Sequence, residues 1–395
     1  MKQIAIAALC AAAVALPAFA DELPGNASFT TLIVTPLAIE GLTGDSAGNL
    51  YTTGRASPVD RPTCPVWRID ASSPAPTEVG AIPNAAPGCN PSGITFDAYG
   101  NLYVADANSG GVVWQLTRNA DGTFNSPATA FASGVPGTNG IAFDRDGNLW
   151  TGDGTTSQGR VWRIASTGGI CEPSFAGCDE VFRIQPMANS KGVGREARTL
   201  QPPPTAANAQ NLVANGVAFD EAGNLYVADT ARGAIWKVRF DGHGALRSRT
   251  GCDSTFTANT LCLENILVAH PLLEGSDGIA LDRAGNIWAD ANERNAIIVV
   301  ERDGRVTEVF RNPVNSAGLR NSADPALGNH HILELPTSPL LVGKRFCTAN
   351  SDGNRRDNSP NSAGEVNSGG PVGARGKISC MDQALKIPGM PLPVR

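Results

Sequence analysis

The chain has 395 residues and carries 31 Lys+Arg against 37 Asp+Glu, a formal net charge of −6 at pH 7. This mildly acidic balance, without a basic run, argues against nucleic acid as a partner. Charged residues make up only 17% of the chain and 44 residues are glycine. Such a composition is typical of a β-rich, turn-rich extracellular protein.

The first twenty residues have the pattern of a secretory signal peptide. Lys2 precedes an apolar run that starts at Ile4, and the small-residue site Ala18-Phe19-Ala20 comes directly before Asp21. Cleavage at that site would give a periplasmic or secreted mature chain, residues 21–395. No other apolar run is long enough to span a membrane, so we expect no membrane partner.

One phrase recurs five times in the mature chain. Each copy has a variable first residue, a Gly, a short stretch in which apolar and small residues alternate, and then Asp-x-x-Gly-Asn. The alternation predicts a β-strand, and Asp-x-x-Gly-Asn predicts a tight turn into a second strand. We call the variable first residues the lead residues: Glu40, Ser92, Asn139, Asn215 and Asp277.

A third predicted strand follows each hairpin, and four of the six tryptophans fall at one register of it. A sixth, weaker copy is traceable at 338–341, 344–348 and 377–380. Repeats of this size built from β-strands indicate a propeller. We therefore expect an all-β, six-bladed β-propeller over residues 21–395. A Pro-rich stretch in the widest gap between lead residues predicts a long insertion at about 166–214, which is a candidate lid.

Without Cys10, which lies in the signal segment, eight cysteines remain. An even number in an oxidising compartment predicts four disulfide bonds, although eight cysteines allow 105 connectivities. The blade map narrows the choice, because it places some cysteines in one blade or around one short loop. It favours the pairs Cys64–Cys89, Cys171–Cys178, Cys252–Cys262 and Cys347–Cys380. Metal binding by thiolates is the alternative, and the absence of any Cys-x-x-Cys pair argues against it.

The lead residues are where we expect chemistry. The first strand of a blade is the innermost, so its first residue lies near the central axis. Glu40, Asn139, Asn215 and Asp277 would then direct four side-chain oxygens to one place. Two carboxylates and two amide carbonyls suit a hard divalent cation such as Ca²⁺. No lead position is His or Cys, which argues against zinc. Taken singly, each of these residues is more often a turn former, so the prediction depends on the set.

Other repeated acids have a structural explanation. Four of them occupy the same position of the hairpin turn in different blades and are expected to be structural: Asp97, Asp144, Asp220 and Asp282. Four more end the second strands and are also expected to form turns, although they approach the same face as the lead residues: Asp106, Asp153, Asp229 and Asp290.

The order of Glu-Gly, Asn-Gly, Asn-Gly-Val-Ala and Asp-Gly-Ile along residues 21–395 resembles the senescence marker protein/gluconolactonase family of six-bladed propellers, with diisopropylfluorophosphatase as a more distant relative. The resemblance implies that Glu40, Asn139, Asn215 and Asp277 are metal ligands and that Asp277 is also the base or nucleophile. Sugar lactonases have an Arg two residues before the first ligand Asn, where this chain has Gly137. This departure argues against a polar sugar lactone, and a more apolar lactone, ester or phosphotriester fits at least as well.

Together these features predict a calcium-dependent hydrolase of the lactonase or esterase type. Ca²⁺ would polarise the scissile carbonyl of a small-molecule lactone or ester, and Asp277 would act as general base. His270, His330 and His331 lie in connections on the lead side and are candidate proton shuttles, with fourth-strand or solvent positions as the alternative. The rival hypotheses are a non-enzymatic NHL-like propeller that binds a protein or small ligand, and a lyase or synthase propeller. The oligomeric state stays open.

Overall fold

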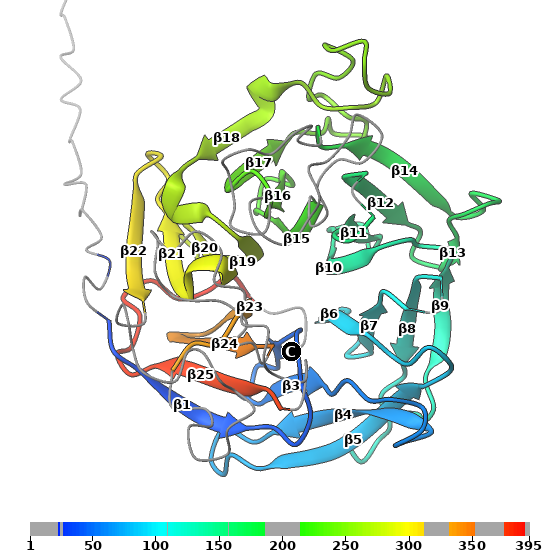
Figure 1. The fold of residues 1–395 in the computed structure, drawn as a ribbon, viewed down its shortest axis with the longest axis vertical. Helices are drawn as coiled ribbons and strands as arrows, with labels where there is room; N and C mark the ends of the chain where they lie inside the picture. Colours follow the sequence, from blue (N-terminus) through cyan, green and yellow to red (C-terminus); the bar gives the residue numbers. More distant parts are fainter. Residues whose placement is uncertain are drawn as a thin grey trace, which may run out of the picture.

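The computed structural model describes residues 23, 27–108, 110–156, 158–185, 214–311, 332–351 and 375–391. Within these ranges the strands form six sheets around a central axis (Figure 1). The prediction of an all-β, six-bladed propeller is confirmed. The expected signal peptide (1–20) and both His330 and His331 lie outside the described residues. No helix in the described ranges has the length and apolar character to span a membrane.

Each sheet runs from an innermost strand to an outer one. Blade 1 contains β2 (Thr43–Gly44), β3 (Leu50–Thr53), β4 (Thr63–Ile69) and β5 (Pro76–Pro83). Blade 2 contains β6 (Pro91–Phe96), β7 (Leu102–Asp106), β8 (Val112–Leu116) and β9 (Thr129–Ser133), with β13 (Gly169–Ile170) at its edge. Blade 3 contains β10 (Thr138–Phe143), β11 (Leu149–Asp153), β12 (Arg160–Ile164) and β14 (Cys178–Arg183).

The remaining blades follow the same plan. Blade 4 contains β15 (Ala214–Phe219), β16 (Leu225–Asp229), β17 (Ala234–Val238) and β18 (Ile266–Ala269). Blade 5 contains β19 (Ser276–Leu281), β20 (Ile287–Ala291), β21 (Ala296–Val300) and β22 (Val306–Arg311). Blade 6 contains β23 (Pro336–Val342), β24 (Arg345–Asn350), β25 (Lys377–Met381) and, at its outer edge, β1 (Phe29–Val34). Three short 3₁₀ helices complete these ranges: η1 (Leu263–Asn265), η2 (Pro271–Leu273) and η3 (Asn292–Arg294).

The ring closes through blade 6, which combines strands from both ends of the chain. β1 pairs antiparallel with β25, with Phe29 opposite Met381 and Val34 opposite Lys377. The sequence pattern indicated the three later strands of this blade but not β1, because β1 is not part of any repeat. Pairing the first strand with the last removes two exposed sheet edges at once.

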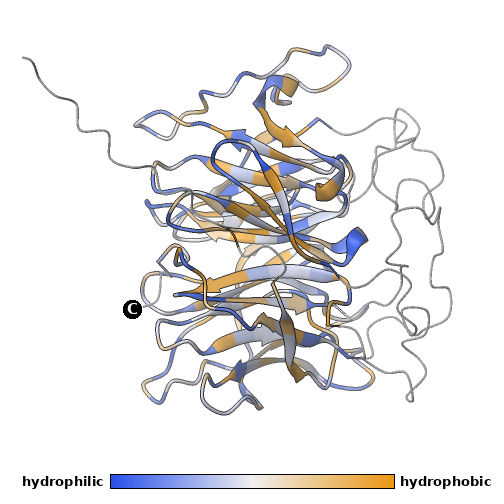
Figure 2. Ribbon diagram, turned by 90° about the vertical axis from the view of Figure 1, so that its left-hand side faces the viewer, coloured by the Kyte–Doolittle hydropathy of each residue, from blue (hydrophilic) through white to orange (hydrophobic). Residues whose placement is uncertain are grey.

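Hydrophobic clusters fill the junctions between neighbouring blades rather than one central core. At the junction of blades 6 and 1, for example, Trp67 and Ile69 pack with Leu340 and Cys347. A side view shows apolar residues along the strands and polar residues at many of the turns on the two faces (Figure 2). This arrangement explains why a long chain needs no second domain to bury its apolar side chains.

The hairpin acids form the turns that the sequence predicts. Asp282, for example, accepts the backbone N–H groups of Ala284 and Asn286 through Oδ1, and the Asn286 amide and the Trp288 indole through Oδ2. Asp45, Asp97, Asp144 and Asp220 accept the corresponding bonds. Each turn therefore orders its blade at the end away from the lead residues.

The first part of the expected insertion at 166–214 belongs to the blades. It contains β13, which extends blade 2, and β14, which is the fourth strand of blade 3. Phe182 of β14 is fully buried in the junction of blades 3 and 4, so this part is packed blade structure rather than a loop. Residues 186–213 lie outside the described ranges.

All four favoured cysteine pairs are disulfide-bonded in the structure: Cys64–Cys89, Cys171–Cys178, Cys252–Cys262 and Cys347–Cys380. Cys347 and Cys380 are direct neighbours on β24 and β25. Their bond ties together two strands of the closing blade, whose repeat pattern is the weakest.

Candidate functional site

The lead residues form a ring at one end of the central axis, because the glycine after each one packs against the backbone of the next blade. A Cβ on Gly41 would lie 2.0 Å from the carbonyl oxygen of Ser92. The same construction continues around the ring: Gly93 to Asn139 at 2.4 Å, Gly140 to Asn215 at 2.8 Å, Gly216 to Asp277 at 2.5 Å and Gly278 to Thr337 at 2.4 Å. Only a residue without a side chain allows backbones to approach this closely.

Thr337 is the sixth lead residue, which sequence reasoning missed. Its hydroxyl donates to the carbonyl oxygen of Glu40 at 2.8 Å and so joins the last blade to the first. Thr337 is followed by Ser338 instead of Gly, so a search for the repeated phrase passes over it. Alignment of β23 with the other innermost strands was the signal that could have found it.

Asn215 presents a buried oxygen that has no hydrogen-bond partner among the described residues. Its Nδ2 donates to the Thr230 hydroxyl at 3.0 Å, and Thr230 in turn donates to the carbonyl oxygen of Ser276 at 2.5 Å. These two hydrogen bonds fix the Asn215 amide so that its Oδ1 is left for another ligand. A buried, unpartnered carbonyl oxygen costs free energy unless it binds water or a cation.

The lead residues can supply enough oxygen ligands for a hard cation only if Asn139 and Asn215 take part. Among the residues that the structure describes, no three His, Cys, Asp or Glu side chains gather as a metal site. Asn139 is held in place by a close approach, since a Cβ on Gly154 would lie 2.6 Å from its Nδ2. Two carboxylates with amide oxygens are ligands of the kind that Ca²⁺ prefers.

Asp277 lies in a polar cluster at the start of β19. Asn292 donates its Nδ2 to Asp277 Oδ2 at 2.8 Å and so fixes the orientation of the carboxylate. Both residues are buried. Asn292 belongs to η3, directly after the second strand of the same blade, so one blade supplies both the acid and the group that positions it.

Asp290 differs from the other acids at second-strand ends, and its expected role as a turn former is wrong. Asp106, Asp153 and Asp229 each accept a backbone N–H from the following loop. Asp290 lies one register position earlier, because Ala291 and not Asp290 pairs with the start of β19. Its side chain is fully buried and accepts a hydrogen bond from the Thr348 hydroxyl at 2.5 Å, while Oδ1 has no hydrogen-bond partner in the described structure.

Burial holds the pKa of Asp290 well above its usual range; the Thr348 hydrogen bond opposes this shift and the charge of nearby Asp277 adds to it. The folded protein therefore keeps a proton on this carboxyl at pH values where the unfolded chain has released it. As a result, the contribution of Asp290 to the free energy of unfolding falls as the pH rises from about 4, the pKa of an unfolded Asp, through the pKa of the folded state.

We expect Asp290→Asn to remove this penalty in the metal-free protein. Asn can still accept the Thr348 hydrogen bond but carries no ionisable group. The melting temperatures of the variant and of wild type are compared in excess chelator. The difference in favour of the variant should grow as the pH rises from 4 to 7. A difference that stays constant over this range would show that Asp290 does not titrate as described.

Glu40 forms an ion pair with Arg55, which follows the second strand of the same blade. Gly137, at the position where sugar lactonases have an arginine, adopts φ +71°, and a Cβ there would lie 2.0 Å from Asp153 Oδ1. A side chain at residue 137 would therefore be strained and would collide with Asp153. The departure from the sugar-lactonase pattern thus has a local steric cause.

His270 has a structural contact. Its Nδ1 accepts the backbone N–H of Leu272 at 3.1 Å and caps η2, between the fourth strand of blade 4 and the first strand of blade 5. His270 is half-buried there, and its role as a proton shuttle stays a prediction. His243 lies at the other end of the propeller, in an exposed turn.

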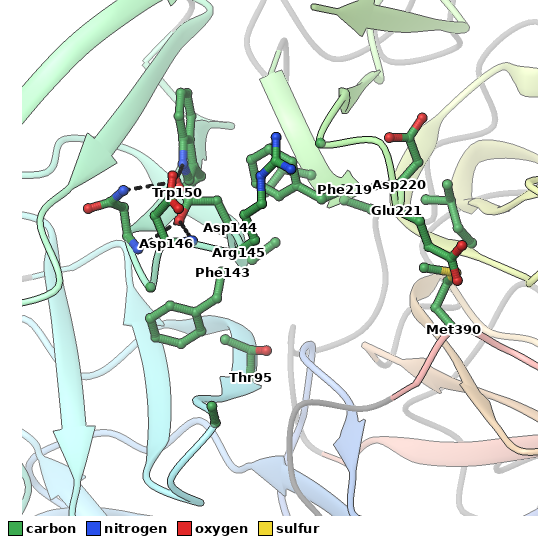
Figure 3. Close-up of a pocket in the computed structure, with 18 of the residues that line it drawn as sticks. Thr95, Phe143, Asp144, Arg145, Asp146, Trp150, Phe219, Asp220, Glu221 and Met390 are labelled. Atoms are coloured by element: carbon green, nitrogen blue, oxygen red, sulfur yellow. Dashed lines mark hydrogen bonds between the residues drawn. The ribbon is translucent and has the colours of Figure 1, made fainter. Parts of the chain in front are cut away.

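A cavity of about 1050 Å³ lies at the end opposite to the lead ring (Figure 3). It is lined by the hairpin turns that join first to second strands, whereas the lead residues start the first strands. Its lining includes the apolar residues Val217, Ile279 and Leu340 and the charged residues Arg145 and Glu221. No sequence pattern predicted this cavity, because its lining comes from hairpin turns whose repeated residues are explained by the turn itself.

Comparisons with known proteins agree with this architecture. Residues 203–319, which include Asn215 and Asp277, match the model of the SMP-30/gluconolactonase/LRE-like region. No curated protein matches the chain.

Three solved structures share the fold over nearly their whole length. Regucalcin, a calcium-binding protein from Agrobacterium tumefaciens, aligns with a TM-score of 0.52 at 15% identity, over 93% of this chain and 97% of that chain. A proposed gluconolactonase gives 0.52 at 15% identity, over 95% and 98%. A luciferin-regenerating enzyme gives 0.53 at 14% identity, over 93% and 99%. The chain thus carries, over residues 203–319, the sequence pattern of the SMP-30/gluconolactonase/LRE-like family on a six-bladed propeller, which confirms the resemblance inferred from the lead residues.

Proposed function

We propose that this protein is a metal-dependent hydrolase of the lactonase or esterase type that acts on a small-molecule substrate. Glu40, Asn139, Asn215 and Asp277 would hold a divalent cation, with Ca²⁺ as the first choice. The single observation that carries the proposal is the buried Oδ1 of Asn215, which has no hydrogen-bond partner among the described residues and belongs to the lead ring. Regucalcin, a calcium-binding protein, and a proposed gluconolactonase have the same fold, which supports the choice of metal and reaction.

The chemistry divides between the cation and the chain. A bound cation would polarise the scissile carbonyl and stabilise the negative charge that develops on its oxygen. Asp277 would remove a proton from the attacking water, while Asn292 keeps its carboxylate in one orientation. The raised pKa of the buried Asp290 carboxyl beside it disfavours a second negative charge next to Asp277. Thr230 would keep the Asn215 amide oriented with its oxygen toward the ring.

We also propose that the protein works in the periplasm or outside the cell. Four disulfide bonds support this location, because such bonds persist in oxidising compartments. The predicted signal peptide supports the same location.

A panel of lactones and aryl esters, assayed with Ca²⁺ and with excess chelator, tests the hydrolase. We expect hydrolysis of at least one panel member, its loss in chelator and its recovery when Ca²⁺ is restored.

The melting temperature provides a second readout of the same site. A cation that binds only the folded state at 100 times its Kd stabilises it by about 2.7 kcal/mol, so chelation should lower the melting temperature. A melt that chelator leaves unchanged would count against the metal site. If calcium stabilised the protein but no panel member were hydrolysed, the NHL-like ligand-binding propeller would be favoured instead.

A further inference from the structure

Arg55 places a guanidinium at the proposed metal site. It follows β3 in blade 1, its backbone N–H donates to the Ala38 carbonyl, and its side chain pairs with the Glu40 carboxylate. The two side chains are 22% and 14% exposed, so solutes can reach them from the lead face. Arg55 is therefore a charged group within reach of both a proposed metal ligand and an incoming substrate.

Four other basic side chains described at this end of the propeller pair with acids that are not proposed metal ligands. Arg160 pairs with Asp153 and Glu172, and its side chain is only 5% exposed. The remaining three pairs are Arg232–Asp229, Arg294–Glu308 and Lys377–Glu334. Arg55 differs from these four because its carboxylate partner is a lead residue.

A second acid that feels the charge of Arg55, Asp106, is held in place by its own blade. Asp106 accepts the backbone N–H groups of Asn90 and Asn108 and the Trp114 indole N–H. Burial raises its pKa, and the charge of Arg55 opposes this shift. Asp106 is thus fixed in blade 2, and Glu40 is the partner whose charge changes when a cation binds.

We propose that Arg55 is a specificity-determining residue that binds an anionic group, such as a carboxylate, on the lactone or ester substrate. This inference rests on the proposed hydrolase function. Coordination of a cation would share the negative charge of Glu40 and weaken its attraction for Arg55. The guanidinium, with five N–H donors in a planar fork, could then bind a substrate carboxylate with two parallel hydrogen bonds. Arg55 would provide from blade 1 the positive charge that Gly137 cannot provide from blade 3.

Two esters of matched shape test the specificity: monophenyl succinate, which carries a carboxylate, and phenyl butyrate, which does not. We expect wild type to prefer monophenyl succinate. Arg55→Met should lose about 100-fold in kcat/KM on monophenyl succinate and less than about threefold on phenyl butyrate, because only the former loses a charge-assisted hydrogen bond. Arg55→Lys keeps the charge without the fork and should retain part of the preference. Equal losses on both esters, or no loss, would overturn the proposal.

Arg61→Met is the matched control. Arg61 lies in the connection between β3 and β4 of blade 1 and pairs with an acid, Glu78 of β5, which is not a lead residue; both side chains are more than one-third exposed. Its removal should leave kcat/KM on both esters unchanged. A loss equal to that of Arg55→Met would show that the effect is general to blade 1 and would overturn the proposal.

Calcium affinity gives a readout that needs no activity. Isothermal titration of chelator-stripped protein should show about tenfold tighter calcium binding by Arg55→Met than by wild type, because a positive charge next to a ligand has been removed. Unchanged or weaker binding would mean that Arg55 does not lie beside the bound cation, and the proposal would fail.

Succinate binding separates this inference from the hydrolase itself. If wild type hydrolysed neither ester, the proposed function would lose support, and titration of calcium-loaded protein with succinate would still test Arg55. We expect wild type to bind succinate and Arg55→Met to bind it at least about tenfold more weakly. Equal binding by the two proteins would overturn the anion site.

Discussion

Replacement of Asp277 by Asn is expected to lower kcat by at least about 100-fold on the best substrate of the lactone and ester panel. Asn has nearly the same size and keeps one ligand oxygen, but it cannot accept a proton from water and it removes one of the two charges that would hold the cation. The fold should survive when calcium is in excess, because Asp277 lies in a polar cluster and not in an apolar junction.

Asp282→Asn is the control for this variant, because it changes the same residue type five positions later in the same blade. Asp282 accepts four hydrogen bonds in the hairpin turn at the opposite end of β19. Its replacement should cost on the order of 1 to 3 kcal/mol of stability, since Asn cannot accept all four bonds, and should leave kcat near wild type. If both variants hydrolysed the substrate at the wild-type rate, catalysis would not depend on the lead ring.

Much of the fold could be predicted because residues close together in the sequence specify the hairpin of each blade. The turn of each repeat is encoded by an Asp whose two oxygens accept three or four hydrogen bonds from nearby donors, so five copies of the motif indicate five hairpins directly. The cysteine pairs followed from the blade map, as Cys347 and Cys380 on adjacent strands illustrate. Local patterns of this kind do not depend on which blades are neighbours.

The features that the sequence did not reveal depend on contacts between distant segments. β1 completes blade 6 although Phe29 and its partner Met381 are 352 positions apart in a chain of 395. Thr337 joins the ring through a backbone contact with Glu40, and no motif marks it. Asp290 was grouped with the other strand-end acids although it comes five residues after its turn glycine, Gly285, where the others come six residues after theirs. The pairing of β19 with β20 shows the consequence of this shift.

The site residues were predicted at the level of their positions but not their environment. The sequence placed Glu40, Asn139, Asn215 and Asp277 at the starts of innermost strands. The structure has Asn139, Asn215 and Asp277 there, and Glu40 three residues before β2. It could not show that Arg55 pairs with Glu40 or that Asn292 orients Asp277, since these partners lie in loops after second strands and follow no repeat. The metal itself stays a prediction.

The largest stability effect is expected at the glycine layer beneath the lead residues. Gly41→Ala would place a methyl group 2.0 Å from the Ser92 carbonyl oxygen and 2.8 Å from the Ile94 side chain. Neither blade can yield without moving its innermost strand, so we expect a loss of about 3 kcal/mol or more in the free energy of unfolding by denaturant. Displacement of the adjacent Glu40 should also weaken calcium binding.

Gly242→Ala is the matched control, because a Cβ there would meet no heavy atom within 4 Å and its φ is not positive. It should change the free energy of unfolding by less than about 0.5 kcal/mol. The contrast isolates the close approach of two backbones from the general effect of replacing a glycine. If Gly41→Ala were as stable as Gly242→Ala and bound calcium equally well, the six innermost strands would not be packed tightly enough to bring the lead residues together, and the proposed metal site would lose its structural basis.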